Sequence, residues 1–425
     1  MSTVAKSPGR LVVVGQGFVG LPIAMRAVEV GFDVVGVDVD VVRVWSLRDG
    51  RSYVEDVTDD ELKRALSSGR YRPTDDYADV EGFDAAIITV PTPLRDSSPD
   101  LSFIEAATSS IAQHVRPGVT VVLESTTYPG TTEELVVPLL EKGSGLSAGQ
   151  DFLVGYSPER IDPGNTRWRF ANTPKVVSGV DSRSLAAVRR LYDRLVEQTV
   201  PVTTPKEAEL AKLLENTFRH VNIALVNELA VFAHQLGVDI WEAIDAATTK
   251  PFGFMRFTPG PGVGGHCLPV DPTYLSWRVR RDLKRDFRFV SLANDVNDHM
   301  PDYVVQRLGA SLNRMRKPVN DSTVLLLGLA YKPNTGDIRE SPALRITELL
   351  TEQGANVQAV DSHVEPHRCP STVKLVELSC QVVRDADAVV LLTDHDDVDY
   401  TLVQRNATAI LDTRRRLSGA NVEYL

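Results

Sequence analysis

The stretch Arg10-Leu-Val-Val-Val-Gly-Gln-Gly-Phe-Val-Gly20 decides the first part of the fold. Its apolar run LVVV predicts a short buried strand that ends in a glycine turn. The next residues, LPIAMRAVEVG, predict a helix that a glycine closes. The run DVVGVD then predicts a second strand, which ends at Asp38. Together these residues predict a strand–turn–helix–strand unit of a parallel α/β sheet.

This unit has the features of a dinucleotide-binding turn, with glycines at 15, 17 and 20 and an acid at the end of the next strand. Glycines let the backbone approach a pyrophosphate, and the helix N-terminus offers N–H groups and the positive end of a dipole. Asp38 can bond to both ribose hydroxyls, and its charge would repel the extra phosphate of NADP. We therefore predict NAD as the cofactor. The alternative is a tight turn that binds no ligand.

Composition limits the class of protein. The chain has 425 residues, enough for two or three domains, with 24% charged residues and a net charge of -11. Because acidic and basic residues are mixed, we do not expect nucleic acid as the main partner. No apolar run suits a membrane span, and the N-terminus lacks a secretory signal. Three cysteines without a CxxC pair favour neither disulfides nor a cysteine zinc site, so we expect a cytoplasmic protein.

Two further strands are predicted in the first half of the chain, within Asp84–Pro93 and Thr120–Thr127. Both end in small hydroxyl residues and proline. In an open α/β sheet the carboxyl ends of the strands face the ligand. We therefore expect Thr92, Ser125 and Thr126 to line the cofactor crevice. Turn residues whose hydroxyls bond only to the protein are the alternative.

The last third of the chain partly repeats this pattern. Strands are predicted at Thr323–Ala330, Val357–Asp361 and Asp387–Asp394, with a helix that starts at the N-cap Ser341. The first turn has lost the three glycines and instead reads Ala-Tyr-Lys-Pro-Asn-Thr-Gly-Asp. A longer turn with a lysine suits a phosphate ligand other than the dinucleotide.

Residues Glu207–Gly237 contain neither proline nor an internal glycine and predict a helix of about 30 residues and about 45 Å. We expect it to join the two nucleotide-type domains and to pack against its copy in a homodimer. Lys212 and Asn216 are four residues apart and share one face, where both could point into a cleft. On the pattern alone, however, a solvated lysine is the better interpretation of Lys212. The predicted fold class is α/β, with two doubly wound Rossmann-like domains joined by a long central helix.

The stretch GPGVGGHCLPVDP, residues 260–272, contains Cys267. A catalytic thiol needs access and a field that favours the thiolate. The glycines remove side chains that would block a ligand, and His266 and Asp271 are close in sequence. A buried structural cysteine is the alternative. A zinc site would need about three ligands, and the adjacent His266 and Cys267 rarely face one ion together, so we expect no metal.

A nicotinamide site combined with a reactive cysteine indicates an oxidation that passes through an aldehyde. The thiolate would trap the aldehyde as a thiohemiacetal, which can lose a second hydride and become a thioester. Water would then release an acid. This chemistry predicts two NADH per substrate.

The chain contains, in this order, the motifs GQGFVGLP, VPTP, STTYPGTT, YSPERIDPGN, ELAKLLENT, FTPGPGVGGHCLPVDP, GLAYKPNTGDIRESPA and DTRRRL. Over residues 10 to 420 these motifs resemble those of the UDP-glucose/GDP-mannose dehydrogenase family. The resemblance implies an NAD-dependent oxidation of the C6 hydroxyl of a nucleotide-diphospho-hexose to an acid. It also implies three domains: an NAD-binding domain (1–203), a central helical region with the cysteine loop (204–300) and a sugar-nucleotide domain (301–425).

The resemblance assigns catalytic roles. Cys267 resembles the nucleophile of the second oxidation, and Lys212 resembles the residue that holds the oxyanion with a bound water. Asn216 resembles the residue that completes this oxyanion site. Glu159 and Thr126 resemble the pair that orients water and handles protons, and Asp271 resembles an acid that activates water.

Binding residues are implied by the same motifs. The NAD positions are Gly15, Gly17, Phe18, Val19, Gly20, Asp38, Arg43, Thr92, Ser125, Thr126 and Arg339. The substrate positions are Glu159, Lys212, Asn216, Gly262, Gly264, Tyr331, Lys332 and Arg414. Of these, residue patterns alone had not pointed to Glu159, Arg339 or Arg414.

The motifs GGHC and SPERIDPGN look most like the branch that acts on UDP-N-acetylhexosamines. UDP-glucose members commonly carry a lysine where this chain has Val270, although glucose remains an alternative, as does a TDP-sugar of secondary metabolism. A two-electron hydroxy-acid dehydrogenase would give no reason for Cys267 or for a second nucleotide-type domain. A non-catalytic sensor of sugar nucleotide and NAD would not need the complete polar set.

Overall fold

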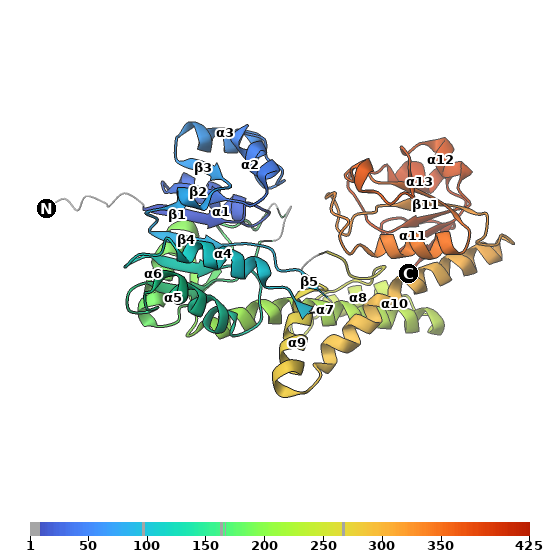
Figure 1. Cartoon of the computed structure of the whole chain (residues 1–425). Helices are drawn as coiled ribbons and strands as arrows, with labels where there is room; N and C mark the ends of the chain where they lie inside the picture. Colours follow the sequence, from blue (N-terminus) through green and yellow to red (C-terminus); the bar gives the residue numbers. More distant parts are fainter. Residues whose placement is uncertain (1–8, 96–97, 162–164, 166, 266–267) are drawn as a thin grey trace. The chain divides into compact units, whose positions relative to one another are not determined.

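A computed structural model describes residues 9–95, 98–161, 165, 167–265 and 268–425. The chain divides into two compact units, Met1–Glu215 and Asn216–Leu425, and each contains one six-stranded sheet (Figure 1). Both six-stranded sheets are fully parallel, and a long helix carries residues of both units. The predicted fold class is therefore confirmed.

The sheet of the first unit has the order β3-β2-β1-β4-β7-β8, so β1 lies between β2 and β4. The register pairs Val12 with Val35 on one side and with Ala86 on the other. The strands are β1 (Arg10–Val14), β2 (Asp33–Val37), β3 (Tyr71–Thr74), β4 (Ala85–Ile88), β7 (Thr120–Leu123) and β8 (Leu153–Tyr156). Strands β1 and β2 were predicted, and the other two predicted segments contain β4 and β7.

Helices cover both faces of this sheet, so its strands are buried on both sides. One face packs against α1 (Gly20–Glu29), α3 (Asp59–Ser67) and α6 (Ser182–Leu195), and the other against α4 (Ser102–Ala112) and α5 (Val137–Ser144). The smaller elements are α2 (Val41–Arg48), the 3₁₀ turn Tyr77–Val80, the π-helical turn Thr132–Val136, β5 (Leu94–Arg95), β6 (Ser98–Pro99), β9 (Lys175–Val177) and β10 (Thr199–Pro201).

The second unit repeats this topology, with the order β13-β12-β11-β14-β15-β16. One face packs against α10 and α11, and the other against α12 and α13. As predicted, the Ser341 hydroxyl caps α11 by accepting a hydrogen bond from the Ala343 N–H at 3.3 Å. The elements are α10 (Arg288–Arg314), β11 (Thr323–Leu327), α11 (Pro342–Glu352), β12 (Asn356–Val360), the 3₁₀ turn Pro366–Arg368, β13 (Lys374–Leu375), α12 (Cys380–Asp385), β14 (Ala388–Leu391), α13 (Tyr400–Asn406), β15 (Ile410–Asp412) and β16 (Val422–Tyr424).

The predicted long helix is α7 (Pro205–Leu236), with 32 residues. It ends before Gly237, whose positive φ of 69° suits glycine. Two further helices come after it in the chain, α8 (Ile240–Thr248) and α9 (Asp271–Leu283). Among the described residues, no helix is both long and apolar enough to cross a membrane.

A buried carboxylate fixes the start of α7 in the first unit. Glu209 is fully buried and accepts hydrogen bonds from the N–H groups of Gly130 (2.6 Å) and Thr132 (2.9 Å) and from the Thr132 hydroxyl (2.7 Å). These groups begin the helical segment that continues into α5, so Glu209 satisfies N–H groups that the helix itself leaves unpaired. Burial raises the pKa of Glu209 to about 7, against the effect of these donors.

We predict that Glu209→Gln destabilises the protein by about 1–3 kcal/mol, because the new amide NH₂ would face a backbone N–H donor. Urea unfolding followed by circular dichroism measures the difference. Glu105→Gln on α4 is the control, since Glu105 is exposed and its substitution should change stability by less than about 0.5 kcal/mol. Equal stability of both variants would show that the Glu209 bonds contribute little.

Candidate functional site

The glycine turn after β1 is shaped by close backbone contacts. Gly15 has a φ of +91°, which favours glycine. A Cβ at Gly20 would lie 1.8 Å from the Gly15 carbonyl oxygen, so any side chain there would separate α1 from the turn. A Cβ at Gly17 would meet no protein atom within 4 Å, which leaves space in front of the turn. Helix α1 has no acid in its first turn, as the binding of a pyrophosphate requires.

Asp38 lies where the sequence predicts, directly after β2 and buried. Its Oδ2 accepts a hydrogen bond from the Gln16 N–H at 2.8 Å, and its Oδ1 accepts one from the Asp40 N–H at 2.9 Å. The Arg43 guanidinium is 3.7 Å from Asp38 Oδ2 and lies over the Tyr53 ring. Each carboxylate oxygen keeps a further lone pair, so the residues present fit the ribose of a dinucleotide.

Gln16, which the sequence had not suggested, stabilises this turn through its buried side chain. Its fully buried side chain donates to the Val13 carbonyl (2.8 Å) and accepts from the Tyr71 hydroxyl (2.7 Å). The Tyr53 hydroxyl donates to the Gln16 carbonyl at 2.6 Å. Burial, and then the Asp38 charge, raise the pKa of Tyr53, so this phenol remains a donor.

Four neighbouring strands deliver the predicted polar residues to one edge of the sheet. Gly15 follows β1, Thr92 follows β4, Ser125 and Thr126 follow β7, and Glu159 follows β8. The Ser125 hydroxyl donates to the Val90 carbonyl at 2.7 Å, which ties the β4 and β7 loops together. The structure thus brings these residues to the carboxyl edge, where open α/β sheets bind ligands.

The segment Ser157–Arg160, called the SPER segment after its sequence, is attached to helix α7, which carries Lys212. Arg160 donates to the Glu215 carboxylate at 2.7 Å and to the Pro174 carbonyl at 2.6 Å. Glu215 lies three residues after Lys212 on α7, so Glu159 and Lys212 belong to segments that one ion pair links. Nothing in the motif pattern indicates this pairing, because Arg160 and Glu215 are distant in sequence.

In the second unit, two predicted catalytic residues are in contact. The Asn216 side-chain NH₂ donates to Asp271 Oδ2 at 2.6 Å, and both residues are buried. Asp271 is the first residue of α9, directly after the cysteine loop. The bond fixes the Asn216 amide with its nitrogen toward Asp271 and leaves the second N–H hydrogen for another acceptor.

The glycines of the cysteine loop (residues 260–272) have a second reason that the sequence did not suggest. A Cβ at Gly264 would lie 2.7 Å from both the Glu340 carbonyl oxygen and Tyr331 Cβ, and one at Gly265 would lie 2.8 Å from the Tyr331 ring. A Cβ at Gly262 would lie 3.1 Å from the Asn297 carbonyl oxygen. The loop needs these glycines to pack against other segments of the second unit.

Gly260, the first glycine of this loop, lies against Arg414, since a Cβ at Gly260 would be 2.8 Å from its guanidinium. The Gly260 N–H donates to the Asn227 side chain at 2.9 Å, and Asn227 donates to Asn297 at 2.9 Å. Arg414 itself is half-buried and donates to the Leu392 carbonyl at 2.7 Å. These contacts place the predicted substrate residue Arg414 beside the cysteine loop.

The glycine turn of the second unit is filled by the protein itself. Asp361 Oδ2 accepts hydrogen bonds from the N–H groups of Leu329 (2.7 Å) and Ala330 (3.0 Å), and lies 3.1 Å from His395 Nε2. Although burial opposes ionisation, these donors lower the pKa of Asp361 to about 2. The two amides are therefore not available to a pyrophosphate, in agreement with the loss of the three-glycine pattern.

The remaining predicted residues of this turn lie on the loop after β11. Tyr331 and Lys332 are half-buried, and the Tyr331 N–H donates to the Asp337 carbonyl at 3.0 Å. Arg339 forms a forked ion pair with Asp337 on the same loop, at 2.6 and 2.9 Å. In the first unit, Phe18 and Val19 form the end of the turn before α1. The predicted roles of Tyr331, Lys332, Arg339, Phe18 and Val19 stay predictions.

Cys267 and His266 lie outside the described residues. The prediction that Cys267 is the nucleophile therefore rests on the sequence alone.

One group in the described part of the chain has the composition of a metal site: His363, His395 and Asp397. However, His395 Nδ1 accepts the Asn334 N–H at 3.0 Å, so its Nε2 carries the hydrogen that faces Asp361. Neither nitrogen of His395 then offers a lone pair to an ion. This group serves the turn of the second unit rather than a metal.

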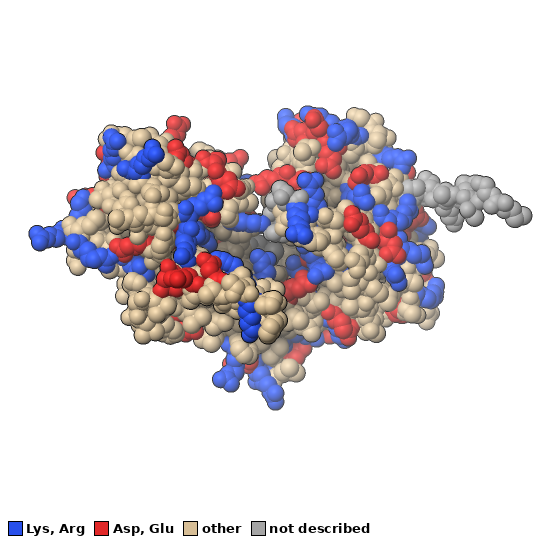
Figure 2. All heavy atoms as spheres, turned by 180° about the vertical axis from the view of Figure 1, so that it is seen from behind, with Lys and Arg blue, Asp and Glu red and all other residues tan. Residues whose placement is uncertain are grey.

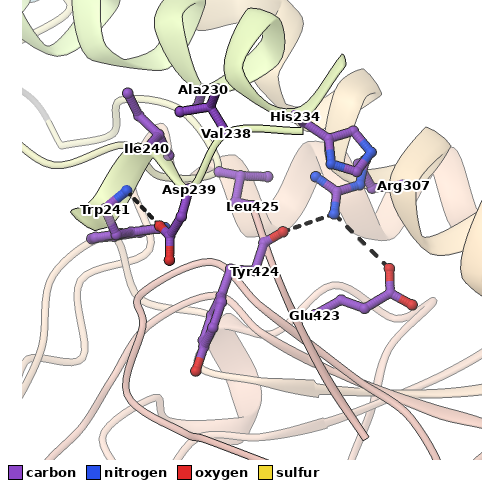
Figure 3. A pocket seen from close by; sticks show the side chains of 10 residues that line it. All are labelled: Ala230, His234, Val238, Asp239, Ile240, Trp241, Arg307, Glu423, Tyr424 and Leu425. Atoms are coloured by element: carbon purple, nitrogen blue, oxygen red, sulfur yellow. Dashed lines mark hydrogen bonds and ion pairs between the residues drawn. The ribbon is translucent and has the colours of Figure 1, made fainter. Parts of the chain in front are cut away.

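A separate pocket of about 280 Å³ lies between α7, α8, α10 and the end of the chain (Figure 3). Arg307 donates to the Tyr424 carbonyl at 2.7 Å and lies 3.9 Å from the Glu423 carboxylate. Two charged side chains of the pocket, Arg307 and Glu423, are therefore paired with each other. None of the predicted site residues lines this pocket.

Charged side chains are mixed on the face drawn in Figure 2. Lys and Arg are interspersed with Asp and Glu over the described residues of this face, and the whole chain has 46 basic and 57 acidic residues. No extended surface of one sign is visible there among those residues.

Comparison with known proteins defines the class. Three models of the UDP-glucose/GDP-mannose dehydrogenase family match the chain: the NAD binding domain at residues 9–196, the central domain at 206–299 and the UDP binding domain at 325–419. The chain therefore belongs to this family of NAD-dependent nucleotide-sugar dehydrogenases. NAD is its cofactor, as predicted, and its turn after β1 lies in the NAD binding domain.

Similar proteins are known over almost the whole chain. UDP-N-acetyl-D-mannosamine dehydrogenase of Pyrococcus horikoshii is 38% identical over 91% of this chain and 90% of its own length. UDP-N-acetyl-D-glucosamine 6-dehydrogenase of Pseudomonas aeruginosa is 36% identical, with 91% of each chain covered. The structure of a UDP-glucose dehydrogenase from Pyrobaculum islandicum is similar with a TM-score of 0.88 at 30% identity, covering 100% of this chain and 98% of that one.

We predict that Asp38→Asn raises the KM for NAD about tenfold or more and leaves kcat nearly unchanged, because charged hydrogen bonds contribute about 1.5–3 kcal/mol. Initial rates at saturating sugar nucleotide provide the measurement. Asp33→Asn is the control, since Asp33 is exposed at the other end of β2. An unchanged KM in Asp38→Asn would contradict the ribose contact.

Proposed function

We propose that this protein oxidises the C6 hydroxyl of a UDP-N-acetylhexosamine to a carboxylate, with two NAD consumed per sugar. The observation that carries the proposal is the match to all three family domains, together with relatives named for UDP-N-acetylmannosamine and UDP-N-acetylglucosamine. The motifs GGHC and SPERIDPGN support the N-acetylated branch. UDP-glucose is the second candidate, because a UDP-glucose dehydrogenase has a very similar structure.

Bound NAD supplies the hydride acceptor for both oxidations, held by the glycine turn, Asp38 and Arg43. Once the alcohol has become an aldehyde, the Cys267 thiolate adds to C6 and gives a thiohemiacetal. Loss of a second hydride from C6 gives a thioester. Water adds to its carbonyl carbon, the carbon–sulfur bond breaks, and the acid and the thiol are released.

The oxygen on C6 becomes negatively charged in each addition step, and two donors of α7 are proposed to stabilise it. Lys212 supplies an ammonium. Asn216 supplies the second hydrogen of its side-chain NH₂ group, which its bond to Asp271 does not use. Glu159 and Thr126, at the carboxyl edge of the first sheet, orient the attacking water and accept its proton.

The second unit is proposed to hold the nucleotide and the sugar. Lys332 and Arg414 provide positive charge for the diphosphate. Gly262 and Gly264 bring backbone N–H groups close to the ligand, and Tyr331 packs against the loop that contains them.

The limits 1–203, 204–300 and 301–425 remain our proposed domain boundaries.

We predict that Cys267→Ser forms no uronic acid from UDP-N-acetylglucosamine or UDP-N-acetylmannosamine and yields at most one NADH per sugar, because the thioester cannot form. NADH absorbance and mass spectrometry of the products measure both quantities. Cys380→Ser is the control, since Cys380 is exposed at the start of α12, and it should retain full activity. Normal uronate output from Cys267→Ser would refute the thioester route.

We also propose that the protein is a cytoplasmic homodimer whose contact includes α7. The support is apolar surface on this helix: Leu214, Leu225 and Leu236 are 62%, 53% and 77% exposed in the single chain. Side chains of this size cluster on a surface mainly where a partner covers them. The odd number of cysteines favours the cytoplasm.

We predict that the wild-type protein sediments at about twice 46.7 kDa and that Leu225→Glu shifts it toward the monomer, because a charge would be buried in an apolar contact. Sedimentation velocity at micromolar concentration is the measurement. Phe103→Glu on α4 is the control, since Phe103 is also exposed but lies on another helix. A wild-type monomer would refute the dimer.

A further inference from the structure

A buried cluster of charges lies behind the Glu159 carboxylate. Lys175 Nζ is 2.8 Å from Glu124 Oε2 and 3.4 Å from Glu159 Oε2. The Tyr192 hydroxyl donates to the other oxygen of Glu124, and the Ile161 N–H donates to Glu159 Oε1. The Lys175 and Glu124 side chains are 3% and 0% exposed, and the Glu159 side chain is 11% exposed. The Glu159 side chain is therefore the most exposed of the three.

Different segments of the first unit build this cluster. Glu124 directly follows β7, Lys175 begins β9, and Tyr192 belongs to α6. The Lys175 ammonium lies near two aromatic rings, 5.4 Å from the centre of Phe170 and 5.5 Å from that of Tyr192. Such contacts stabilise a cation that has lost its water. Lys175 is thus held from several sides.

The backbone next to Glu159 is held against the same strand. Arg160 donates to the carbonyl of Pro174, the residue before Lys175, at 2.6 Å. Two consecutive residues of the SPER segment therefore bond to two consecutive residues at the start of β9. This arrangement fixes the position and the direction of the Glu159 side chain.

The charges do not balance within the cluster, because two carboxylates share one ammonium. Burial raises the pKa of Glu124 to about 7, and the nearby Glu159 charge acts in the same direction. Burial alone would lower the pKa of Lys175, but the Glu124 and Glu159 charges reverse the effect and raise it. Lys175 therefore remains an ammonium and is the one cation in contact with both acids among the described residues.

We propose that Lys175 is a positioning residue of the reaction: its ammonium holds the Glu159 carboxylate at the carboxyl edge of the sheet, where Glu159 handles the proton of the attacking water. This inference rests on the proposed function, which gives Glu159 its role. It adds a residue that belongs to none of the predicted catalytic or binding positions. Lys175 acts through Glu159 and touches neither substrate nor cofactor.

A purely structural role for Lys175 is the competing explanation, since a buried ion pair can serve only to fill space. The two explanations predict different effects when the ammonium is lost. Without it, Glu124 and Glu159 are neighbouring buried acids, and both burial and like charge favour the protonated carboxyl. A positioning role then predicts a shifted pH profile, whereas a structural role predicts only reduced stability.

Among the described residues, the other charged groups next to Glu159 are paired. Glu124 follows β7 and bonds to Lys175 and to Tyr192 of α6. Arg160, the next residue, is paired with Glu215 of α7. Lys175 is therefore the substitution that changes the charge next to Glu159 most directly.

The test is the pH dependence of kcat for the full-length enzyme with saturating NAD and UDP-N-acetylglucosamine or UDP-N-acetylmannosamine, whichever it oxidises. In Lys175→Met, kcat at pH 7 is expected to fall about tenfold or more, and the acidic limb is expected to move up by about one pH unit or more. Lys175→Arg should restore most of the activity, because it keeps the charge. KM values for both substrates should stay within about twofold.

The double variant Glu124→Gln/Lys175→Met keeps the test decisive if Lys175→Met does not fold. It removes the cation together with one of the two acids, so the buried charge is unchanged. Its acidic limb should still move up, by less than in Lys175→Met, because burial alone then acts on Glu159. A folded Lys175→Met, or the double variant in its place, with the wild-type pH profile would overturn the inference.

Glu159→Gln separates this inference from the proposed function. If Glu159→Gln is strongly impaired while Lys175→Met keeps the wild-type profile, only the role of Lys175 is wrong. If Glu159→Gln oxidises the sugar at the wild-type rate, the proposed role of Glu159 fails, and the inference fails with it. Wild-type enzyme that oxidises no nucleotide sugar would refute the proposed function itself.

Discussion

The pairing of β1 with two parallel neighbours is the constraint on which the rest of the first unit depends. β1 hydrogen-bonds to β2 on one side and to β4 on the other, so the strand order reverses at this strand. The loops after β1, β4, β7 and β8 therefore emerge at one edge, next to one another. The glycine turn, the hydroxyl residues and Glu159 lie on these loops, and the proposed chemistry needs them together.

The second unit uses the same strand order for another purpose. β11 takes the place of β1 between β12 and β14, but Asp361 fills the amides of the turn after it. In the first unit Asp38 accepts one amide of the turn after β1, that of Gln16, and Gly17 leaves open space beside it. Two copies of one fold can thus offer different surfaces, because a single carboxylate accepts one amide in one turn and two in the other.

Local patterns in the sequence predict the features that depend on neighbouring residues. The strands β1, β2 and β11, the helix α7 and the Ser341 cap all result from short-range rules, and all are confirmed. Contacts between distant residues were not predictable in this way. Lys175 and Glu124 are 51 residues apart, and the glycines of the cysteine loop are required by Tyr331 and Glu340. Motif resemblance supplied Glu159, but not the lysine behind it.

The central claim is that one protein carries out both oxidations at C6. It is tested most directly by the yield of NADH from a limiting amount of each candidate: UDP-N-acetylglucosamine, UDP-N-acetylmannosamine, UDP-glucose, TDP-glucose and GDP-mannose. We expect two NADH and one uronic acid per molecule of one UDP-N-acetylhexosamine. A yield of one NADH, with an aldehyde or ketone as the final product, would contradict it and would make Cys267 a structural residue.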